Sequence, residues 1–202
     1  MSADRRAPSV EHDAIVLAGG RGERLGGRDK ALVEVGGRPL LARVLDATAG
    51  ARSVVVVGSP RPGFDGVHWA SEEPPGGGPT AGIVAGLRAL GDGAGPWVLV
   101  LAVDQPGTAA VVPAMLQAAA AAAPDVDALC PHDSAGHPQW LLAAYRRDAL
   151  VAACAAVGSG HGVSVRRLVA ELRIIDVPVA GENVGDVDTW DDHRAWQDRL
   201  QP

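Results

Sequence analysis

Residues 14–32, AIVLAGGRGERLGGRDKAL, decide the fold of this chain. The apolar run at 15–18 is followed by a loop with five glycines and three arginines before a lysine, Lys30. Glycines let backbone N–H groups approach an anion closely, and the cations supply charge for a polyphosphate. The pattern therefore predicts a buried strand that ends in a phosphate-binding loop, and with it a nucleotide site.

Two better-known glycine-rich motifs do not fit this loop. A P-loop needs Lys and Ser or Thr after its last glycine, but Arg28 and Asp29 follow Gly27. The dinucleotide fingerprint meets Leu25 at its third glycine, and the next apolar run, 53–57, ends in Gly-Ser-Pro instead of an acid. Neither a P-loop ATPase nor a nicotinamide-dependent enzyme fits the chain well.

The composition is that of one globular domain. The chain has 202 residues, of which 47% are hydrophobic. We expect a disordered leader at 1–12 and a single domain at 13–202. No apolar run approaches the ~20 residues of a membrane span, and the start has no apolar core for a signal peptide, so we expect no membrane contact.

Charge and cysteine usage narrow the class further. A net charge of −6 argues against nucleic-acid binding, while four cations gather in the first loop. Lys30 is the only lysine of the chain, every other cation being arginine. Cys130 and Cys154 are far apart in sequence and have no ligand cluster around them, so we expect reduced core residues in a cytoplasmic protein.

Apolar runs alternate with helical patterns along the whole chain. The strand patterns cover 14–18, 53–57, 67–70, 97–102, 128–130, 140–145 and 174–177. The helical patterns cover 39–49, 81–90, 111–123, 147–156, 163–171 and 191–200. Continuous apolar strands indicate a sheet buried on both faces, which predicts an α/β fold of three layers, Rossmann-like, with a mostly parallel central sheet. Ligands bind such sheets beyond the carboxyl ends of the strands.

The strand pattern at 97–102 leads into a single carboxylate, Asp104, followed by Pro106. Mg²⁺ takes one or two carboxylates and completes its coordination with phosphate oxygens and water. A carboxylate at a strand end, facing a polyphosphate, predicts a Mg²⁺ ligand. A turn or helix-cap role for Asp104 is the alternative.

The first loop resembles the nucleotidyltransferase pattern L-A-G-G-x-x-x-R-[ML]-G-x-x-K. Its double glycine and its Asp29-Lys30 pair are similar to the MobA-like molybdenum cofactor guanylyltransferases, and the resemblance extends from residue 14 to residue 200. It implies transfer of GMP from Mg-GTP to the terminal phosphate of molybdopterin, which releases pyrophosphate. It also implies transient contacts with other molybdenum cofactor biosynthesis proteins or with recipient oxidoreductases.

The resemblance assigns roles to individual residues. It implies catalytic roles for Arg24, Lys30 and Asp104, and metal contacts for Asp104 and Asp188. The residues expected to bind the nucleotide are Leu17, Ala18, Gly19, Gly20, Lys30, Glu73, Gly78, Gly82 and Asp104.

Three further segments resemble the same family. Residues 72–82, EEPPGGGPTAG, are similar to its acid-x-x-G-P-L-A-G segment, with Glu73 as the nearest match to its aspartate. Residues 136–145 resemble its acceptor-side segment, in which we interpret His137 as a wall or structural residue. Residues 183–190, NVGDVDTW, have Trp190 in place of the usual proline, and Thr189 with Asp192 has capping-box spacing.

Three other functions stay open on the sequence. The nearest is a transferase of the same superfamily that uses CTP or another phosphorylated acceptor. A non-catalytic nucleotide-binding protein that delivers the cofactor is the second, although binding alone does not explain Lys30 and Asp104 together. A sugar-phosphate nucleotidyltransferase is the third, but those chains are usually longer.

Overall fold

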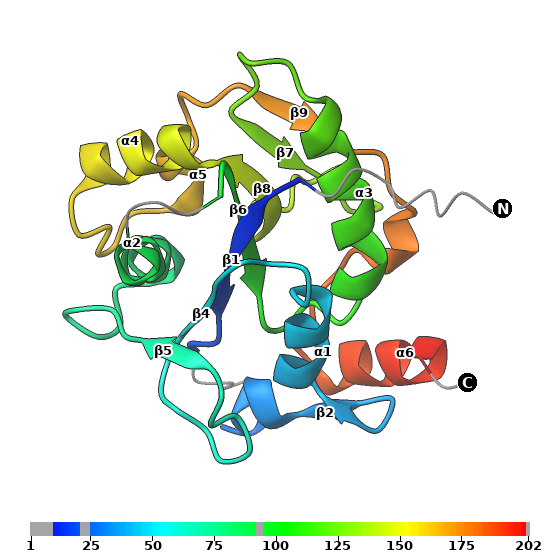
Figure 1. Cartoon of the computed structure of the whole chain (residues 1–202). Coiled ribbons are helices and arrows are strands. Elements are labelled where there is room, and N and C mark those ends of the chain that lie inside the picture. The colour runs from blue at the N-terminus through cyan, green and yellow to red at the C-terminus, as the bar shows by residue number, and fades with distance from the viewer. Residues whose placement is uncertain (1–9, 21–24, 92–94, 201–202) are drawn as a thin grey trace, which may run out of the picture.

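A seven-stranded sheet forms the centre of the protein, in the order β5–β4–β1–β6–β8–β7–β9 (Figure 1). The computed structural model describes residues 10–20, 25–91 and 95–200. The strands of the sheet are β1 (His12–Leu17), β4 (Val54–Val57), β5 (His68–Ala70), β6 (Trp97–Ala102), β7 (Ala128–Cys130), β8 (Leu142–Arg146) and β9 (Ile174–Asp176). Strand β8 runs antiparallel to its two neighbours, and the other pairs are parallel. The prediction of a mostly parallel α/β sheet is confirmed.

Helices cover both faces of the sheet (Figure 1). One face carries α2 (Pro79–Leu90), α4 (Arg147–Val157) and α5 (Val165–Leu168). The other face carries α1 (Leu40–Ala47) and α3 (Thr108–Ala121), with α6 (Trp190–Leu200) beside them. The sheet therefore separates two helical layers, as the three-layer prediction requires.

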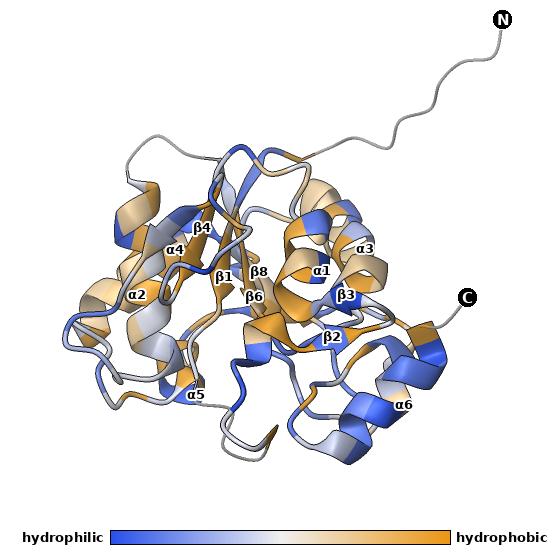
Figure 2. Cartoon of the chain, turned by 90° about the horizontal axis from the view of Figure 1, so that it is seen from below, coloured by the Kyte–Doolittle hydropathy of each residue, from blue (hydrophilic) through white to orange (hydrophobic). Residues whose placement is uncertain are grey.

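The central strands explain why the apolar runs are continuous. Ala14 and Val16 of β1 pack into one buried cluster with α1 and α3, whereas Ile15 and Leu17 pack into another with α2 and α4. Every residue of β1 and of β6 is buried. Figure 2 shows the same arrangement as hydrophobic strands in the middle and hydrophilic stretches on α6. Burial on both faces removes the polar alternation that an exposed face would require.

The structure corrects the extent of the leader. Strand β1 begins at His12, which was assigned to the leader, and both His12 and Asp13 are buried. Asp13 accepts a hydrogen bond of 2.7 Å from Arg147 and another from the backbone N–H of Gly95. These hydrogen bonds offset the cost of burying the Asp13 carboxylate. Its partners are distant in the chain, so the sequence alone does not indicate that Asp13 is buried. Residues 1–9 lie outside the part of the chain that the structure describes.

A short hairpin between the first loop and α1 was not predicted. It consists of β2 (Glu34–Val35) and β3 (Arg38–Pro39), joined by Gly36 and Gly37 with φ values of +57° and +70°. Two residues with positive φ give the tight turn that suits a hairpin, and glycine adopts it without steric cost. Two-residue strands are too short to give a periodic pattern, so only the Gly-Gly pair signals them.

Element ends differ from the predictions by a few residues. Helix α2 begins at Pro79 and α3 at Thr108, which is earlier than predicted, and α5 is only one turn long. The oxygen of Ser164 caps that turn by accepting from the N–H of Arg167. No helix in residues 10–20, 25–91 and 95–200 is both long and apolar enough to cross a membrane.

Both cysteines are free and buried, as predicted. Burial raises the pKa of Cys130 to about 12 and that of Cys154 to about 11. Thiols with such pKa values are almost entirely protonated at neutral pH and react slowly, because the thiolate is the nucleophile. The cysteines therefore act as core residues.

Candidate active site

The glycine loop and Asp104 leave the sheet side by side. Strands β1 and β6 are parallel neighbours in which Leu17 pairs with Ala102, and the N–H of Val103 donates to the Leu17 carbonyl at 3.0 Å. The chain continues from these ends into Gly19 and Asp104. A side chain added at Gly19 would meet nothing within 4 Å. The backbone at this edge of the sheet is therefore open to a ligand.

Lys30 brings two distant carboxylates together. It begins the 3₁₀ turn η2 (Lys30–Leu32), and its ammonium group lies 3.1 Å from Oδ2 of Asp104. The same ammonium group donates to Oδ1 of Asp188. Burial by itself lowers the pKa of Lys30, but the hydrogen bonds and charges of Asp188 and Asp104 outweigh it, so the pKa is raised above 10.5. Lys30 is therefore a cation at neutral pH.

A backbone hydrogen bond holds the segment around Asp188 against the end of β6. The N–H of Val187 donates to the Asp104 carbonyl at 2.8 Å, and the Val187 side chain is fully buried. The neighbouring Asp186 is exposed. Although the residue as a whole is exposed, partial desolvation of its carboxyl group and the charges of Asp188 and Asp104 raise its pKa. The site thus holds three carboxylates near one lysine, an excess of negative charge.

Asp188 also lies at the start of α6, where the predicted capping box is present. Asp192 accepts from the backbone N–H of Thr189 at 2.8 Å and from its hydroxyl group at 2.7 Å. These hydrogen bonds, which outweigh the small effect of burial, lower the pKa of Asp192. The N–H of Asp192 donates back to the Thr189 hydroxyl group. The cap orients the helix start and with it the backbone of Asp188.

The donors at this edge fit a divalent cation that is held partly by its substrate. Asp104 and Asp188 both reach the Lys30 ammonium group, so their carboxylates are close enough to share a cation. Within residues 10–20, 25–91 and 95–200, no cluster of three or more His, Cys, Asp or Glu side chains is arranged to hold a metal ion by itself. Mg²⁺ is typically bound by one or two carboxylates together with substrate phosphates and water, which is the set available here.

The other predicted nucleotide-binding residues occupy different surroundings. Gly19 and Gly20 are exposed, and Gly20 has a φ of +122°. Ala18 is buried, so only its backbone can face a ligand. Arg24, which was predicted to be catalytic and not a nucleotide contact, lies outside the described residues.

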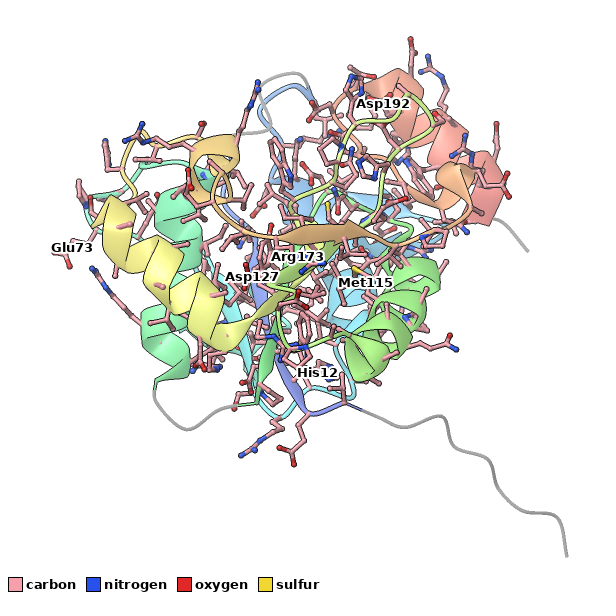
Figure 3. All side chains as sticks on the ribbon, turned by 90° about the horizontal axis from the view of Figure 1, so that it is seen from above. His12, Glu73, Met115, Asp127, Arg173 and Asp192 are labelled. Carbon is pink, nitrogen blue, oxygen red and sulfur yellow. The ribbon has the colours of Figure 1, made fainter. Side chains whose placement is uncertain are left out.

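In the loop before α2, two adjacent glutamates point in different directions. Glu73, the predicted nucleotide contact, is exposed at the outer edge of the molecule (Figure 3). Glu72 instead turns into the loop, where it accepts from the N–H of Gly77 at 2.8 Å. Gly78 precedes α2 with a φ of +85°, and Gly82 is buried against Leu17. Gly82 has a packing role in this structure, and its contact with a nucleotide stays a prediction, as does that of Glu73.

The segment at 136–145 connects to the site through glutamines that the sequence did not single out. Gln105, next to Asp104, donates to Gln139 at 3.4 Å, and Gln139 in turn donates to Asp133. His137 is exposed and contacts Asp133, which agrees with a structural role. Tyr145 is buried in β8 and donates to the carbonyl of Trp140.

An open groove adjoins the Lys30–Asp188 contact. Its volume is ~540 Å³, and it is lined by Arg28, Asp29, Leu32, Val33, Glu34, Trp190 and His193. The guanidinium group of Arg28 lies 5.4 Å from the centre of the Trp190 ring. The same two segments make both contacts. Arg28 precedes Lys30 by two residues, and its partner Trp190 follows Asp188 by two residues. The groove is thus formed by residues that flank Lys30 and Asp188 in the chain, although neither of these two residues lines it.

Figure 3 shows how far this site is from the start of the sheet. His12, at the beginning of β1, and Asp192, at the beginning of α6, lie at opposite ends of the molecule. The residues brought together come from β1, η2, the end of β6 and the segment before α6. All lie at the carboxyl edge, where ligands bind open α/β sheets.

The fold and this edge define a nucleotidyltransferase architecture. The chain is similar to molybdopterin-guanine dinucleotide biosynthesis protein A from Archaeoglobus fulgidus, with a TM-score of 0.68 and 22% identity over 93% of this chain and 97% of that one. It is also similar to 2-C-methyl-D-erythritol 4-phosphate cytidylyltransferase from Thermus thermophilus, with a TM-score of 0.64 and 19% identity over 92% and 96% of the two chains.

The chain belongs to the family of MobA-like NTP transferase domains, whose profile matches residues 14–175. A probable molybdenum cofactor guanylyltransferase from Natronomonas pharaonis is 31% identical over 157 residues, 72% of this chain and 73% of that protein. The molybdenum cofactor guanylyltransferase of Pseudomonas putida strain F1 is 40% identical over 97 residues, 46% and 49% of the two chains. The matched region thus spans about half the length of this Pseudomonas relative.

Proposed function

We propose that this protein is a nucleotidyltransferase that transfers GMP from Mg-GTP to the phosphate of molybdopterin. The observation that carries the proposal is the convergence of Lys30, Asp104 and Asp188 at the carboxyl edge of the sheet. Guanine and molybdopterin are inferred from the names of the Pseudomonas and Natronomonas relatives. A cytoplasmic location and transient contacts with molybdenum cofactor proteins remain predictions of the sequence.

The reaction joins two anions, so the task of the protein is to neutralise and align them. The acceptor phosphate oxygen forms a bond to the α-phosphorus while the bond to the pyrophosphate oxygen breaks in line. Lys30 supplies positive charge to the phosphates, and the backbone from Leu17 to Gly20 lies against the nucleotide. When bound, Mg²⁺ would be held by Asp104 and Asp188 and would neutralise phosphate charge. Arg24, in the same loop, adds charge in this proposal.

The groove beside Lys30 is suited to the body of the acceptor. Trp190 is 38% exposed and Leu32 43% exposed, two of the few large hydrophobic side chains so exposed among the described residues. In this proposal a planar heteroaromatic ring stacks on Trp190 in place of the Arg28 guanidinium group that lies over it, and Arg28 then meets the anionic part of the substrate. An acceptor lying in this groove keeps its phosphate close to Lys30.

A nucleotide series tests this function first. Thermal shifts are measured with GTP, CTP, ATP and UTP, each with and without Mg²⁺. Selective stabilisation by Mg-GTP, followed by pyrophosphate release that depends on molybdopterin, supports the proposal. Stabilisation by CTP identifies a cytidylyltransferase with the same edge, and tight nucleotide binding without pyrophosphate release identifies a non-catalytic carrier.

A further inference from the structure

Arg61, in the loop after β4, is almost enclosed beside the proposed site. Its side chain is only 9% exposed. All three of its side-chain nitrogens donate hydrogen bonds within the protein: Nε to Asp29, Nη1 to the Ser59 carbonyl, and Nη2 to both the Ala18 carbonyl and Asp29. An arginine that is this fully engaged has a fixed orientation.

The contact between Arg61 and Asp29 has the two-pronged geometry of a strong pair. Nε lies 2.6 Å from Oδ2 of Asp29, and Nη2 lies 2.9 Å from Oδ1. Two parallel charge-assisted hydrogen bonds fix both the distance and the plane of the carboxylate. Nη2 also lies 2.8 Å from the Ala18 carbonyl, at the end of β1. Arg61 therefore connects Asp29 to the rigid sheet.

Asp29 in turn determines where the turn that carries Lys30 begins. Its Oδ1 accepts from the N–H of Ala31 at 3.1 Å, which caps η2, and its carbonyl accepts from the N–H of Leu32 at 3.0 Å. Lys30 is the next residue in the chain. A shift of the Asp29 carboxylate therefore moves the base of the Lys30 side chain.

We infer that Arg61 is the positioning residue of Lys30: through Asp29 it anchors η2 to the end of β1, so that the ammonium group meets Asp104 and Asp188. The inference rests on the proposed role of Lys30. Gly58 makes the arrangement possible, because a Cβ atom there would lie 3.1 Å from the Ala18 carbonyl oxygen and 3.4 Å from Nη1 of Arg61. The ring of Trp69, 5.7 Å from the Arg61 guanidinium carbon, covers the arginine from the edge strand β5.

The single lysine of the chain makes a direct test possible without any activity assay. Protein grown with ¹³C-labelled lysine gives only one lysine Cε–Hε side-chain signal in an NMR spectrum, that of Lys30. In the wild type we expect a shifted, narrow signal, because the ammonium group is held by hydrogen bonds to Asp188 and Asp104. In Arg61→Met the signal moves towards the chemical shift of a free lysine and loses the spread that a fixed environment gives it.

Two variants make this test specific. Arg52→Met is the matched control, because Arg52 forms an exposed ion pair with Glu11 at 3.3 Å, and its Lys30 signal is expected to be that of the wild type. Asp29→Asn keeps an oxygen for the cap but removes the charge that Arg61 holds, and it is expected to shift Lys30 in the same direction as Arg61→Met. The double variant is then expected to shift no further than either single variant, because both act through one contact.

A wild-type Lys30 signal in either folded variant would overturn the inference. If Arg61→Met does not fold, Asp29→Asn decides alone. In turnover, loss of positioning is expected to lower kcat by about 10²-fold with little change in KM for the nucleotide. Because the NMR result does not depend on turnover, an inactive wild type would refute the proposed function and leave the positioning role standing.

Discussion

The ammonium group of Lys30 lies 3.1 Å from Oδ2 of Asp104, which is 74 residues away in the chain, and it also donates to Asp188, 158 residues away. This lysine neutralises carboxylates that the proposed reaction uses to hold a metal ion. In the proposed mechanism a metal–nucleotide complex would give both sides new partners, since its phosphates would attract the ammonium group and its metal the carboxylates. The contact of Lys30 with two carboxylates therefore balances part of the negative charge at this edge of the sheet.

Replacing Lys30 tests whether its charge acts on the phosphates. Lys30→Met is expected to lower turnover by about 10³-fold while the protein stays folded, because a preorganised charge at the phosphates is lost. Lys30→Arg keeps the charge with a different shape and is expected to retain more activity. Pyrophosphate release and thermal unfolding of the three proteins check this, and a normal rate in Lys30→Met would contradict the mechanism.

Replacing Asp104 tests the proposed metal contact. Asp104→Asn removes a charge but keeps an oxygen that can accept from Lys30. We expect half-maximal activity to need at least about tenfold more Mg²⁺, since one of the two carboxylates available to the ion is lost. The Mg²⁺ dependence of turnover is the measurement, with Asp198→Asn, an exposed position of α6, as the control. An unchanged Mg²⁺ dependence would remove Asp104 from the metal site.

The carboxylates are expected to make stability depend on pH. The pKa of Asp186 is raised by desolvation and by the charges of Asp188 and Asp104, so the folded state retains a proton that the unfolded state has already lost. Stability contributed by this residue is therefore present at low pH and falls as the pH rises from 3.8 through the raised pKa.

Asp186→Asn removes the fall in folding stability that Asp186 causes as the pH rises. We expect its unfolding temperature to exceed that of the wild type by a few degrees at most at pH 7, and the difference to disappear near pH 3. Mg²⁺ is expected to stabilise the wild type more than the variant. Unfolding curves at both pH values check this, and a variant less stable than the wild type at neutral pH would contradict it.

Replacing Trp190 tests whether the groove binds the acceptor. Trp190→Ala is expected to raise KM for the acceptor by about tenfold and to leave KM for GTP unchanged, because one aromatic stack is worth about 0.5–1.5 kcal/mol. Trp190→Phe, which keeps an aromatic face, is the matched control and is expected to stay near the wild type. An equal rise of both KM values would show that Trp190 supports the whole site instead of the acceptor groove.

Adding a methyl group at Gly107 tests whether its close contact with Asn183 holds the segment before α6 in place. A Cβ atom at Gly107 would collide with the carbonyl oxygen of Asn183, at the end of the 3₁₀ turn η3 (Gly181–Asn183). Gly107→Ala is expected to cost about 1–3 kcal/mol of stability and to displace the segment that carries Asp188. Gly66→Ala, where nothing lies within 4 Å, is the control for thermal unfolding and turnover. Wild-type values in both proteins would show that this contact does not hold the site.

The elements that the sequence predicted are those with strong periodic or continuous apolar patterns. Strands β6 and β7 have the predicted bounds, because their residues are apolar throughout and buried on both sides. The hairpin of β2 and β3 gave no such pattern, since each strand has two residues. The polar His12 was assigned to the leader because polar residues normally indicate exposure. Asp13, next to it, is buried with two partners that are distant in the chain, Arg147 and the backbone N–H of Gly95.

The sequence by itself determined the α/β class, the strand that ends in a glycine loop, and the two residue types, lysine and aspartate, that the proposed chemistry needs. Those features are local, because they follow from hydrophobic runs and from the residues next to them. The tertiary structure decided that Lys30 meets Asp104 and Asp188, that Arg61 holds Asp29, and that Glu72 rather than Glu73 turns into its loop. These contacts join segments from different strands or choose between neighbouring side chains, so they depend on packing geometry, which no local pattern encodes.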